Sequence, residues 1–428
     1  MATVFKFGGA STQNAEGIKR VEAIIESFVQ ENPAKGLVVV VSAMGKTTNA
    51  LEKILQQSWD NQAFQESLEA LQQYHRQIVS DLLAPQHQAP VTEALADYFQ
   101  QMRHYLENKP EKVSFDAYYD GLVAYGELLS STIVAYFLEA SGLPTQWVDA
   151  RRCCVTDSTW REGKIDWIAT QNQVKQHIAP HLGTSIVVTQ GFIGANYQHK
   201  TTTLGREGSD FTAGVLAYCL EATQVVIWKD VKGVWSADPK RFSWAQPLPQ
   251  LSYRQTAEMS YLGASVVHPK TLAPLAQKQI PLFVKSFAEP QAVGTCIAQT
   301  EGTALIPMAL VKENQVYVSL YTRHLQPMDE QLVEEILKRV ALYNLKINLI
   351  QKNSFQIELV LEHHPHRLQP WLNRLEELSL SLEKKVLCSL VSFKNCPWSL
   401  LAIDVPEGQW LLHQQNNGWQ QAVVVSSE

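Results

Sequence analysis

The start of the chain decides the fold, because residues 4–11 read Val4-Phe5-Lys6-Phe7-Gly8-Gly9-Ala10-Ser11. The apolar opening predicts a buried strand, and the paired glycines predict a tight turn after it. An amphipathic helix is expected over 18–29 and a second buried strand over 37–41. Strand, turn, helix and strand form a βαβ unit, which favours a mostly parallel sheet sandwiched by helices, with ligands at the carboxyl ends of its strands.

This α/β pattern continues to about residue 298. A polar stretch of helical period, interrupted at 84–90, predicts a helical insertion over the sheet edge at about 51–120, and a further helix is expected over 115–140. Four apolar runs predict more strands, at 146–148, 185–188, 225–228 and 282–284. We therefore expect one large α/β domain over 1–298.

The pattern changes after residue 298, which indicates a second domain over 299–428. Within about 316–393 the expected elements follow the order βαββαβ, which is the ferredoxin-like order. They are strands over 316–320, 347–350, 355–361 and 386–393 and helices over 328–343 and 368–378. Asn416-Asn417-Gly418 lies between two apolar runs and predicts a closing hairpin.

Composition excludes several classes of function. The chain has 428 residues, of which 45% are hydrophobic and 18% charged, and its net charge of -6 without a basic cluster argues against a nucleic-acid partner. Its six cysteines show neither zinc-ligand spacing nor a disulfide pattern, so we assign no metal site. With no leader segment and no apolar run of membrane-spanning length, we expect a cytoplasmic protein without membrane contact.

The first glycine turn is a candidate phosphate site. Lys6 supplies a cation at the end of a strand, and Gly8 and Gly9 allow backbone amides to approach phosphate oxygens. A plain tight turn between strand and helix would have the same sequence. Gly45-Lys46-Thr47 imitates the end of a Walker loop, but Val40 stands where that loop requires glycine, which argues against a P-loop nucleotidase.

A second turn, within 203–213, carries groups that suit a small zwitterion. Arg206 offers a planar fork for a carboxylate, while Asp210 offers a negative charge to an ammonium or orders cationic groups. The alternative is an ordinary helix cap, in which Ser209 or Asp210 satisfies the first turn of the helix that follows.

Three further segments allow both a functional and a structural interpretation. Hydroxyl residues over 42–49 can bond a substrate or cap a helix. Glu127 lies in an apolar helix, where a buried carboxylate needs a partner such as a substrate ammonium or a structural arginine. Residues 228–240 have the parts to hold a base, ribose and phosphates, or form a polar loop with one tryptophan pinned to the core.

In this order, these segments resemble the aspartate kinases of the amino acid kinase superfamily over nearly the whole chain. The resemblance rests on 6–11, 42–49, 126–132, 190–213, 228–240 and 261–269. It implies catalytic roles for Lys6 and Asp210 and an aspartate site made by Ser42, Thr48, Glu127, Arg206 and Ser209. The implied ATP site comprises Lys6, Gly8, Gly9, Ser11, Lys229, Asp230, Trp235, Lys240, Ser265 and Val266.

The implied activity is transfer of the ATP γ-phosphate to the β-carboxylate of L-aspartate, the first step toward lysine, threonine and methionine. Mg²⁺ would be held mainly by the ATP phosphates. A carboxylate nucleophile is already ionised at neutral pH, so the missing general base fits this chemistry. Two alternatives stay open: another enzyme of the same fold, acting on acetylglutamate or UMP, and a non-catalytic amino-acid sensor.

The C-terminal βαββαβ unit resembles the ACT regulatory domain of these kinases. It implies feedback control by lysine or threonine and a homodimer or higher homo-oligomer. One unit, about 316–393, is complete, whereas 307–315 and 394–428 are too short for an ordinary second unit. The sequence also departs from the family at Glu207, Lys229, Trp235 and Ser265, where glycine, threonine, tyrosine and lysine are common, so we expect altered nucleotide contacts.

Overall fold

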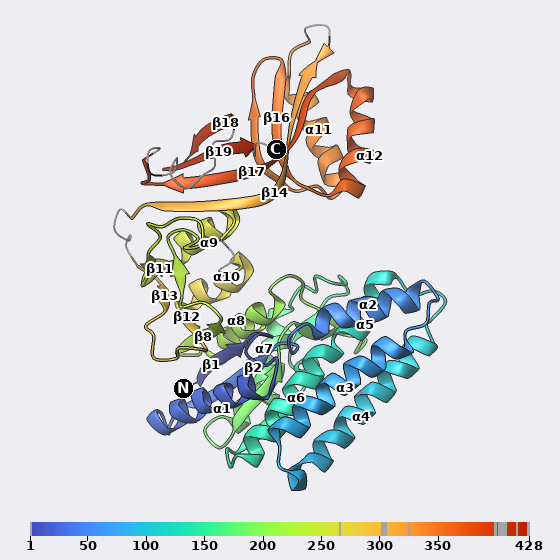
Figure 1. The fold of residues 1–428 in the computed structure, drawn as a ribbon, viewed down its shortest axis with the longest axis vertical. Coiled ribbons are helices and arrows are strands. Elements are labelled where there is room, and N and C mark those ends of the chain that lie inside the picture. The colour runs from blue at the N-terminus through green and yellow to red at the C-terminus, as the bar shows by residue number, and fades with distance from the viewer. Residues whose placement is uncertain are drawn as a thin grey trace. The chain divides into compact units, whose positions relative to one another are not determined.

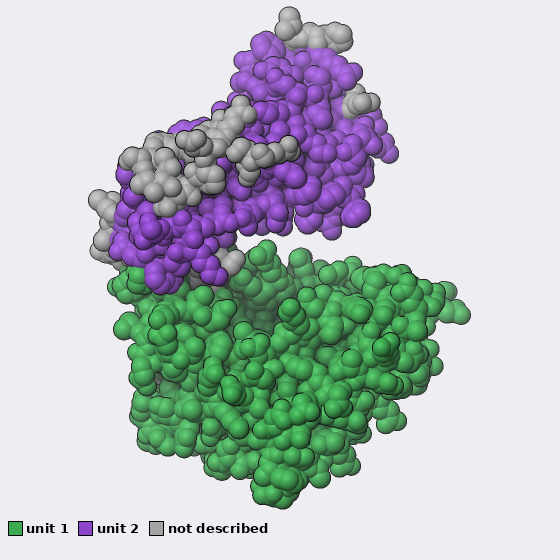
Figure 2. All heavy atoms as spheres, in the orientation of Figure 1, with its two compact units in different colours: residues 1–234, 247–257, 266–302 green, residues 235–246, 258–265, 303–428 purple. Residues whose placement is uncertain are grey.

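The computed structural model describes residues 2–264, 267–300, 306–323, 326–397, 400, 409–416 and 418–425. The chain forms two compact units (Figure 2). Unit 1 comprises Met1–Val234, Pro247–Ala257 and Val266–Gly302, and unit 2 comprises Trp235–Gln246, Glu258–Ser265 and Thr303–Glu428. Two short segments before residue 298 thus belong to the same unit as the C-terminal region.

Unit 1 is built on an eight-stranded sheet of order β11-β13-β12-β8-β1-β2-β5-β3 (Figure 1). The first strand, β1, pairs in parallel with β2 and β8, and among the described strands of this sheet only β12 and β13 pair antiparallel. The predicted mostly parallel sheet is therefore confirmed. The strands are β1 (Ala2–Phe7), β2 (Gly36–Val41), β3 (Thr145–Val148), β5 (Ile186–Gln190), β8 (Gln224–Lys229), β11 (Gln250–Ser252), β12 (Leu282–Ser286) and β13 (Thr295–Ala298).

The central strands are buried on both faces, as the continuous apolar runs predict. Phe7, Val39 and Val41 pack in one hydrophobic core with side chains of the first six helices. Those helices are α1 (Ala15–Glu31), α2 (Thr47–Trp59), α3 (Gln65–Leu82), α4 (Pro85–Glu107), α5 (Phe115–Val123) and α6 (Tyr125–Ala140). Figure 1 shows α2, α3, α4 and α6 gathered side by side, and the first three of these helices cover most of the stretch 51–120 for which the sequence predicts helices.

Two helix boundaries differ from the sequence prediction. The expected break at 84–90 shrinks to two residues, because Pro85 occupies the first turn of α4, where a missing N–H costs nothing. The single helix expected over 115–140 is two helices, α5 and α6, that meet at Ala124. By length and composition 115–140 could cross a membrane, but 83% of its most apolar window is buried within the structure, as in the core helix of a globular fold.

The remaining elements of this region are shorter. A small three-stranded sheet has the order β4-β6-β7, and its last two strands connect β5 of the large sheet to α8 along the chain. The helices are α7 (Trp167–His177), α8 (Gly208–Leu220), α9 (Tyr253–Leu262) and α10 (Pro269–Lys278), with short 3-10 turns η1 (Ala150–Arg152) and η2 (Ala179–His181). The strands are β4 (Val155–Thr156), β6 (Ile193–Asn196), β7 (Thr201–Thr203), β9 (Val234–Trp235) and β10 (Pro247–Leu248).

The C-terminal region of unit 2 forms a sheet of order β15-β16-β14-β17-β19-β18, in which neighbours are antiparallel. Its elements are β14 (Met308–Thr322), α11 (Glu330–Leu342), β15 (Ile347–Lys352), β16 (Gln356–Glu362), α12 (Pro365–Leu375), η4 (Glu376–Leu378), β17 (Leu380–Lys394), β18 (Gln409–Asn416) and β19 (Trp419–Val425). The βαββαβ order is as predicted, and Ile336, Trp371 and Leu359 pack in the core between helices and sheet.

The two long strands β14 and β17 extend beyond the βαββαβ unit. Their outer parts pair from Met308 with Lys394 to Lys312 with Leu390, and the hairpin of β18 and β19 adds to the edge of β17. The predicted closing hairpin is present, although Asn417 at its turn lies outside the described residues.

Candidate active site

The candidate site lies at the carboxyl edge of the sheet of unit 1. The adjacent parallel strands β8, β1, β2 and β5 end next to one another there. The segments that follow them begin with Asp230, Gly8, Ser42 and Gly191. Residues that are far apart in sequence therefore meet at one edge, as expected for ligand sites in parallel sheets.

An ion cluster of one acid and two lysines lies at this edge. The Lys6 Nζ atom lies 2.7 Å from Asp210 Oδ1, and the Lys229 Nζ atom lies 3.4 Å from Asp210 Oδ2. Burial alone would raise the pKa of the Asp210 carboxyl, but Lys6 and Lys229 lower that pKa below its ordinary value. Asp210 is thus a fixed anion that holds two ammonium groups beside the first turn.

The first glycine turn is held tightly against the segment that follows β2. The Ser11 hydroxyl donates to the Gly8 carbonyl at 2.6 Å, and the Gly45 N–H donates to the Gly9 carbonyl at 3.0 Å. A Cβ atom on Gly9 would lie 2.6 Å from the Ala43 carbonyl oxygen, so glycine is required there by close approach of two backbones. A Cβ atom on Gly8 would lie 3.5 Å from Lys6 Nζ, so this residue presents bare backbone beside the ammonium.

Glu127 is a buried carboxyl with a hydrogen bond to only one of its two oxygens in the described part of the chain. Its Oε1 atom accepts from the Ala43 N–H at 3.3 Å, while Oε2 has no hydrogen bond in the described part of the chain. Burial raises the pKa of Glu127 to about 8, and Lys6 partly offsets this rise. Within the described residues no arginine bonds to it, which removes the structural alternative and leaves one acceptor open.

The hydroxyl residues after β2 do not cap the helix that follows. Lys46 is the N-cap of α2, and among the residues that the structure describes no side chain caps that helix. Ser42 is held instead by α6, because the Ser130 hydroxyl donates to the Ser42 carbonyl at 2.7 Å. Thr48 is half-buried in the first turn of α2. The capping alternative for this segment is therefore excluded.

The arginine-bearing turn also lacks the side-chain cap that the sequence allowed. Glu207 is the N-cap of α8, with a φ of 53°, and no side chain bonds the first amides of the helix. Arg206 is exposed and makes no ion pair or hydrogen bond within the described residues. Ser209 packs under the turn after β5, because a Cβ atom on Gly191 would lie 2.4 Å from the Ser209 Cβ. The guanidinium is thus free to receive an anion.

Comparison with known proteins gives the family. The sequence model of the amino acid kinase family matches residues 1–286. The chain is 31% identical over 360 residues to lysine-sensitive aspartokinase 3 of Escherichia coli (strain K12), a match that covers 84% of this chain and 78% of that protein. The chain belongs to the aspartokinases of the amino acid kinase family.

Two further comparisons describe the extent of the likeness. The structure of E. coli aspartokinase III in complex with aspartate and ADP matches this aspartokinase with a TM-score of 0.82 and 26% identity, over 99% of this chain and 96% of that one. Bifunctional aspartokinase/homoserine dehydrogenase 2, chloroplastic, of Arabidopsis thaliana is 32% identical over 310 residues, which is 70% of this chain and 32% of the relative.

Of the five residues predicted to contact the base and ribose, only Asp230 is placed by the described residues at the carboxyl edge of the sheet of unit 1. Asp230 follows β8 and is exposed, whereas Trp235 and Lys240 belong to unit 2, where the Lys240 N–H donates to Asp238 at 2.9 Å. Ser265 and Val266 lie outside the described residues. No group of three or more metal-ligating side chains occurs among the residues that the structure describes.

Asp120, which the sequence did not single out, is a buried carboxylate that holds the segment before the arginine-bearing turn. This buried carboxylate of α5 accepts from the Thr203 N–H at 2.9 Å, from the Thr203 hydroxyl at 2.7 Å and from the Arg161 N–H at 3.0 Å. It thereby fixes the end of β7, which leads into the arginine-bearing turn. The signal was the one that marked Glu127, a carboxylate within an apolar helical stretch.

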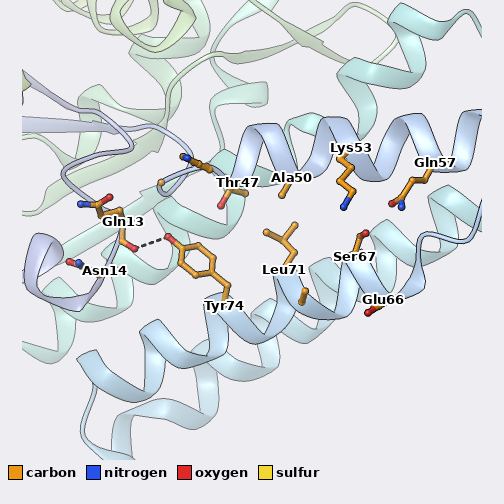
Figure 3. Close-up of a pocket in the computed structure, with 13 residues that line it drawn as sticks. Gln13, Asn14, Thr47, Ala50, Lys53, Gln57, Glu66, Ser67, Leu71 and Tyr74 are labelled. Atoms are coloured by element: carbon orange, nitrogen blue, oxygen red, sulfur yellow. Dashed lines mark hydrogen bonds between the residues drawn. The ribbon is translucent and has the colours of Figure 1, made fainter.

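A cavity of about 810 Å³ lies between α2 and α3, beside the candidate site (Figure 3). It reaches Gly45, Lys46 and Thr47 at the start of α2 and is bounded at one end by the Tyr74 hydroxyl, which donates to the Gln13 carbonyl at 2.7 Å. Its lining contains none of the three residues of the ion cluster. The cavity therefore adjoins the segment after β2 without opening onto Lys6.

Proposed function

We propose that this aspartokinase transfers the γ-phosphoryl group of ATP to the β-carboxylate of L-aspartate and forms 4-phospho-L-aspartate. The observation that carries the proposal is the arrangement of Lys6. Its ammonium is held by Asp210, adjoins the bare backbone of Gly8 and acts on the open carboxyl of Glu127. One cation thus lies beside a turn suited to phosphate and also lowers the pKa of a carboxyl suited to an ammonium.

The amino-acid half of the site consists of two opposite charges and three hydroxyls. Arg206 would hold the α-carboxylate of aspartate through its free guanidinium fork. Glu127 would receive the ammonium on its unbonded oxygen. Ser42, Thr48 and Ser209 would supply the remaining hydrogen bonds. A substrate without a free ammonium, such as acetylglutamate, would leave Glu127 unpaired, and UMP would have no use for this pair of charges.

The nucleotide half of the site contains cations and bare backbone. Lys6, Lys229 and the turn of Gly8, Gly9 and Ser11 would hold the phosphates, and we assign base and ribose contacts to Asp230, Trp235, Lys240, Ser265 and Val266 by family resemblance. By the same resemblance, Mg²⁺ would be carried mainly by the ATP phosphates. When bound, Mg²⁺ neutralises phosphate charge.

The chemistry follows from alignment and charge. A β-carboxylate oxygen forms a bond to the γ-phosphorus while the bond between that phosphorus and the bridging oxygen breaks, and ADP leaves. No proton has to be removed, since the carboxylate is ionised at neutral pH. Lys6 and Lys229 would stabilise the negative charge that develops on the transferring group, and Asp210 would keep both ammonium groups in place before substrate arrives.

We further propose that the C-terminal region, about 299–428, is an ACT-like regulatory domain and that 1–298 is catalytic. The E. coli relative is named for its sensitivity to lysine. Lysine or threonine would therefore inhibit this chain, which we place in the cytoplasm as a homodimer or a higher homo-oligomer. Activity measured with each amino acid, singly and together, tests the effector, and light scattering tests the assembly.

The hydroxamate assay tests the activity itself. Purified protein is incubated with ATP, Mg²⁺, aspartate and hydroxylamine, which traps the acyl phosphate as aspartyl hydroxamate. We expect product with wild type. Hydroxamate from acetylglutamate but not from aspartate, or ADP release with UMP but not with aspartate, would contradict the proposal. A protein that is inert with all three, yet binds lysine or threonine, would instead be an amino-acid sensor.

A further inference from the structure

Lys270 bridges the two ends of the arginine-bearing turn. Its Nζ atom donates to the Leu204 carbonyl at 2.8 Å and lies 5.5 Å from the centre of the Phe211 ring. Leu204 precedes the turn and Phe211 lies in the first helical turn after it, next to Asp210. One side chain of α10 therefore contacts both the start of the turn and the helix that it enters.

The turn needs such support because its backbone is unusual. Gly205 has a φ of 73° and Glu207 a φ of 53°, so the residue before Arg206 and the residue after it are both in the left-handed region. On one side the Leu204 N–H donates to the Phe192 carbonyl at 2.8 Å. On the other side, Lys270 donates to the Leu204 carbonyl, so both backbone polar groups of Leu204 are hydrogen-bonded.

Both the backbone and the side chain of Lys270 have partners. It lies in the first turn of α10, and the His268 side chain accepts from its N–H at 3.2 Å and so caps that helix. The ammonium is half-buried and faces the charges of Glu162, Glu207 and Asp210, although no carboxylate of the described residues lies within ion-pair distance of it. Its direct contacts are the carbonyl and the ring.

We propose that Lys270 is a positioning residue that sets Arg206 for the α-carboxylate of aspartate by fixing Leu204 and the first turn of α8. The inference rests on the proposed function, since it takes Arg206 as the aspartate clamp. Lys270 need not touch substrate, and its effect should therefore appear in the use of aspartate and not in the use of ATP.

The chain contains a matched control on the same pair of helices. Lys278, at the far end of α10, donates to Glu221 at 2.7 Å and lies 5.2 Å from the centre of the Tyr218 ring. Like Lys270, it thus makes one ring contact to α8 and one hydrogen bond to a residue just outside α8, but at the end of that helix remote from Arg206. Lys278→Met should therefore change the free energy of unfolding about as much as Lys270→Met does, but it should not change the KM for aspartate.

The experiment measures aspartate and ATP kinetics for wild type, Lys270→Met, Lys270→Arg and Lys278→Met. We expect Lys270→Met to raise the KM for aspartate about tenfold, the size of one hydrogen bond to a charged group. Its kcat and KM for ATP should change by less than about twofold. Lys270→Arg should restore most of the loss, and Lys278→Met should match wild type.

A double substitution separates this inference from the proposed function. If Lys270 acts through Arg206, adding Lys270→Met to Arg206→Ala should leave the KM for aspartate as it is in Arg206→Ala. Three results would overturn the inference while the proposed function stands. The first is a Lys270→Met protein whose kcat and KM for aspartate equal those of wild type. The others are a Lys270→Met protein whose KM rises equally for aspartate and ATP, and a Lys278→Met protein whose KM for aspartate rises as much as that of Lys270→Met. An inert wild type would overturn both.

Discussion

Lys6 and Asp210 lie 2.7 Å apart, although they belong to the first strand and to the eighth helix of the chain. The packing explains the contact, because β1 is central in the sheet and α8 packs against it. Lys229 joins them from the neighbouring strand β8. The two ammonium groups are thus placed by the sheet, and the acid between them is placed by the helix.

Replacing Lys6 by alanine should nearly abolish activity. The substitution removes a cation that is already oriented by Asp210, and loss of one such stabilising group costs about 100- to 1000-fold in kcat. It should also raise the pKa of Asp210, since its closest positive charge is gone. Turnover in the hydroxamate assay measures the effect, and circular dichroism checks the fold. A variant that keeps more than about a tenth of wild-type kcat would contradict the role of Lys6.

Glu127 should make aspartate binding release a proton near neutral pH. Its pKa of about 8 in the free protein means that the carboxyl is largely protonated at pH 7, and an ammonium bound to it should lower that pKa. Calorimetric titration of aspartate in buffers of different ionisation enthalpy counts the released protons. Glu127→Gln should release none and should bind aspartate more weakly, whereas equal proton release in both proteins would exclude Glu127 as the source.

The same carboxyl should make the fold less stable as the pH rises. Its pKa rises from an ordinary 4.5 to about 8 on folding, so the folded chain keeps a proton that the unfolded chain loses between those values. The free energy of unfolding therefore falls through this window. Urea unfolding at several pH values should show Glu127→Gln gaining on wild type toward pH 8, and a constant difference between them would be contrary to expectation.

Much of the fold followed from local pattern. Continuous apolar runs predict strands that are buried on both faces, and β1 and β2 have that burial at every described position. The βαββαβ order followed likewise from alternating periods. The exact join at Ala124 between α5 and α6 did not, because the glycines that flank it, Gly121 and Gly126, lie inside the two helices and do not mark where one ends and the next begins.

The site was only partly predictable, because some of its contacts join residues that are far apart in the sequence. Glu127 could be recognised because its neighbours are apolar, and Asp120 carries the same local signal. Lys270 could not, since its importance lies in a contact with the Leu204 carbonyl, and only the packing of α10 on α8 creates that contact. The free guanidinium of Arg206 and the lack of a side-chain cap at Glu207 likewise depend on the backbone path.

Replacing Glu207 by glycine, the residue common in the family, should stabilise the fold. Glu207 has a φ of 53°, and the left-handed conformation costs a non-glycine residue about 1–2 kcal/mol, part of which glycine loses again through its own entropy. We expect a net gain of about 0.5–1 kcal/mol in the free energy of unfolding by urea. Glu207→Ala is the control, because it removes the carboxylate and keeps the strain, and it should give no gain.

Gly8 and Gly9 should respond differently to alanine, although they are neighbours in one turn. A Cβ atom on Gly9 would lie 2.6 Å from the Ala43 carbonyl oxygen, too close to accept, so Gly9→Ala should push apart the segments after β1 and β2 and lower the melting temperature. A Cβ atom on Gly8 would lie 3.5 Å from Lys6 Nζ, which is an ordinary contact. The melting temperature of Gly8→Ala should therefore be close to that of wild type. It should nevertheless raise the KM for ATP, because a methyl group would stand where phosphate oxygens approach the backbone. Thermal melts and ATP kinetics of the two variants check both halves, and a Gly8→Ala protein with a normal KM for ATP would show that this turn does not hold the nucleotide.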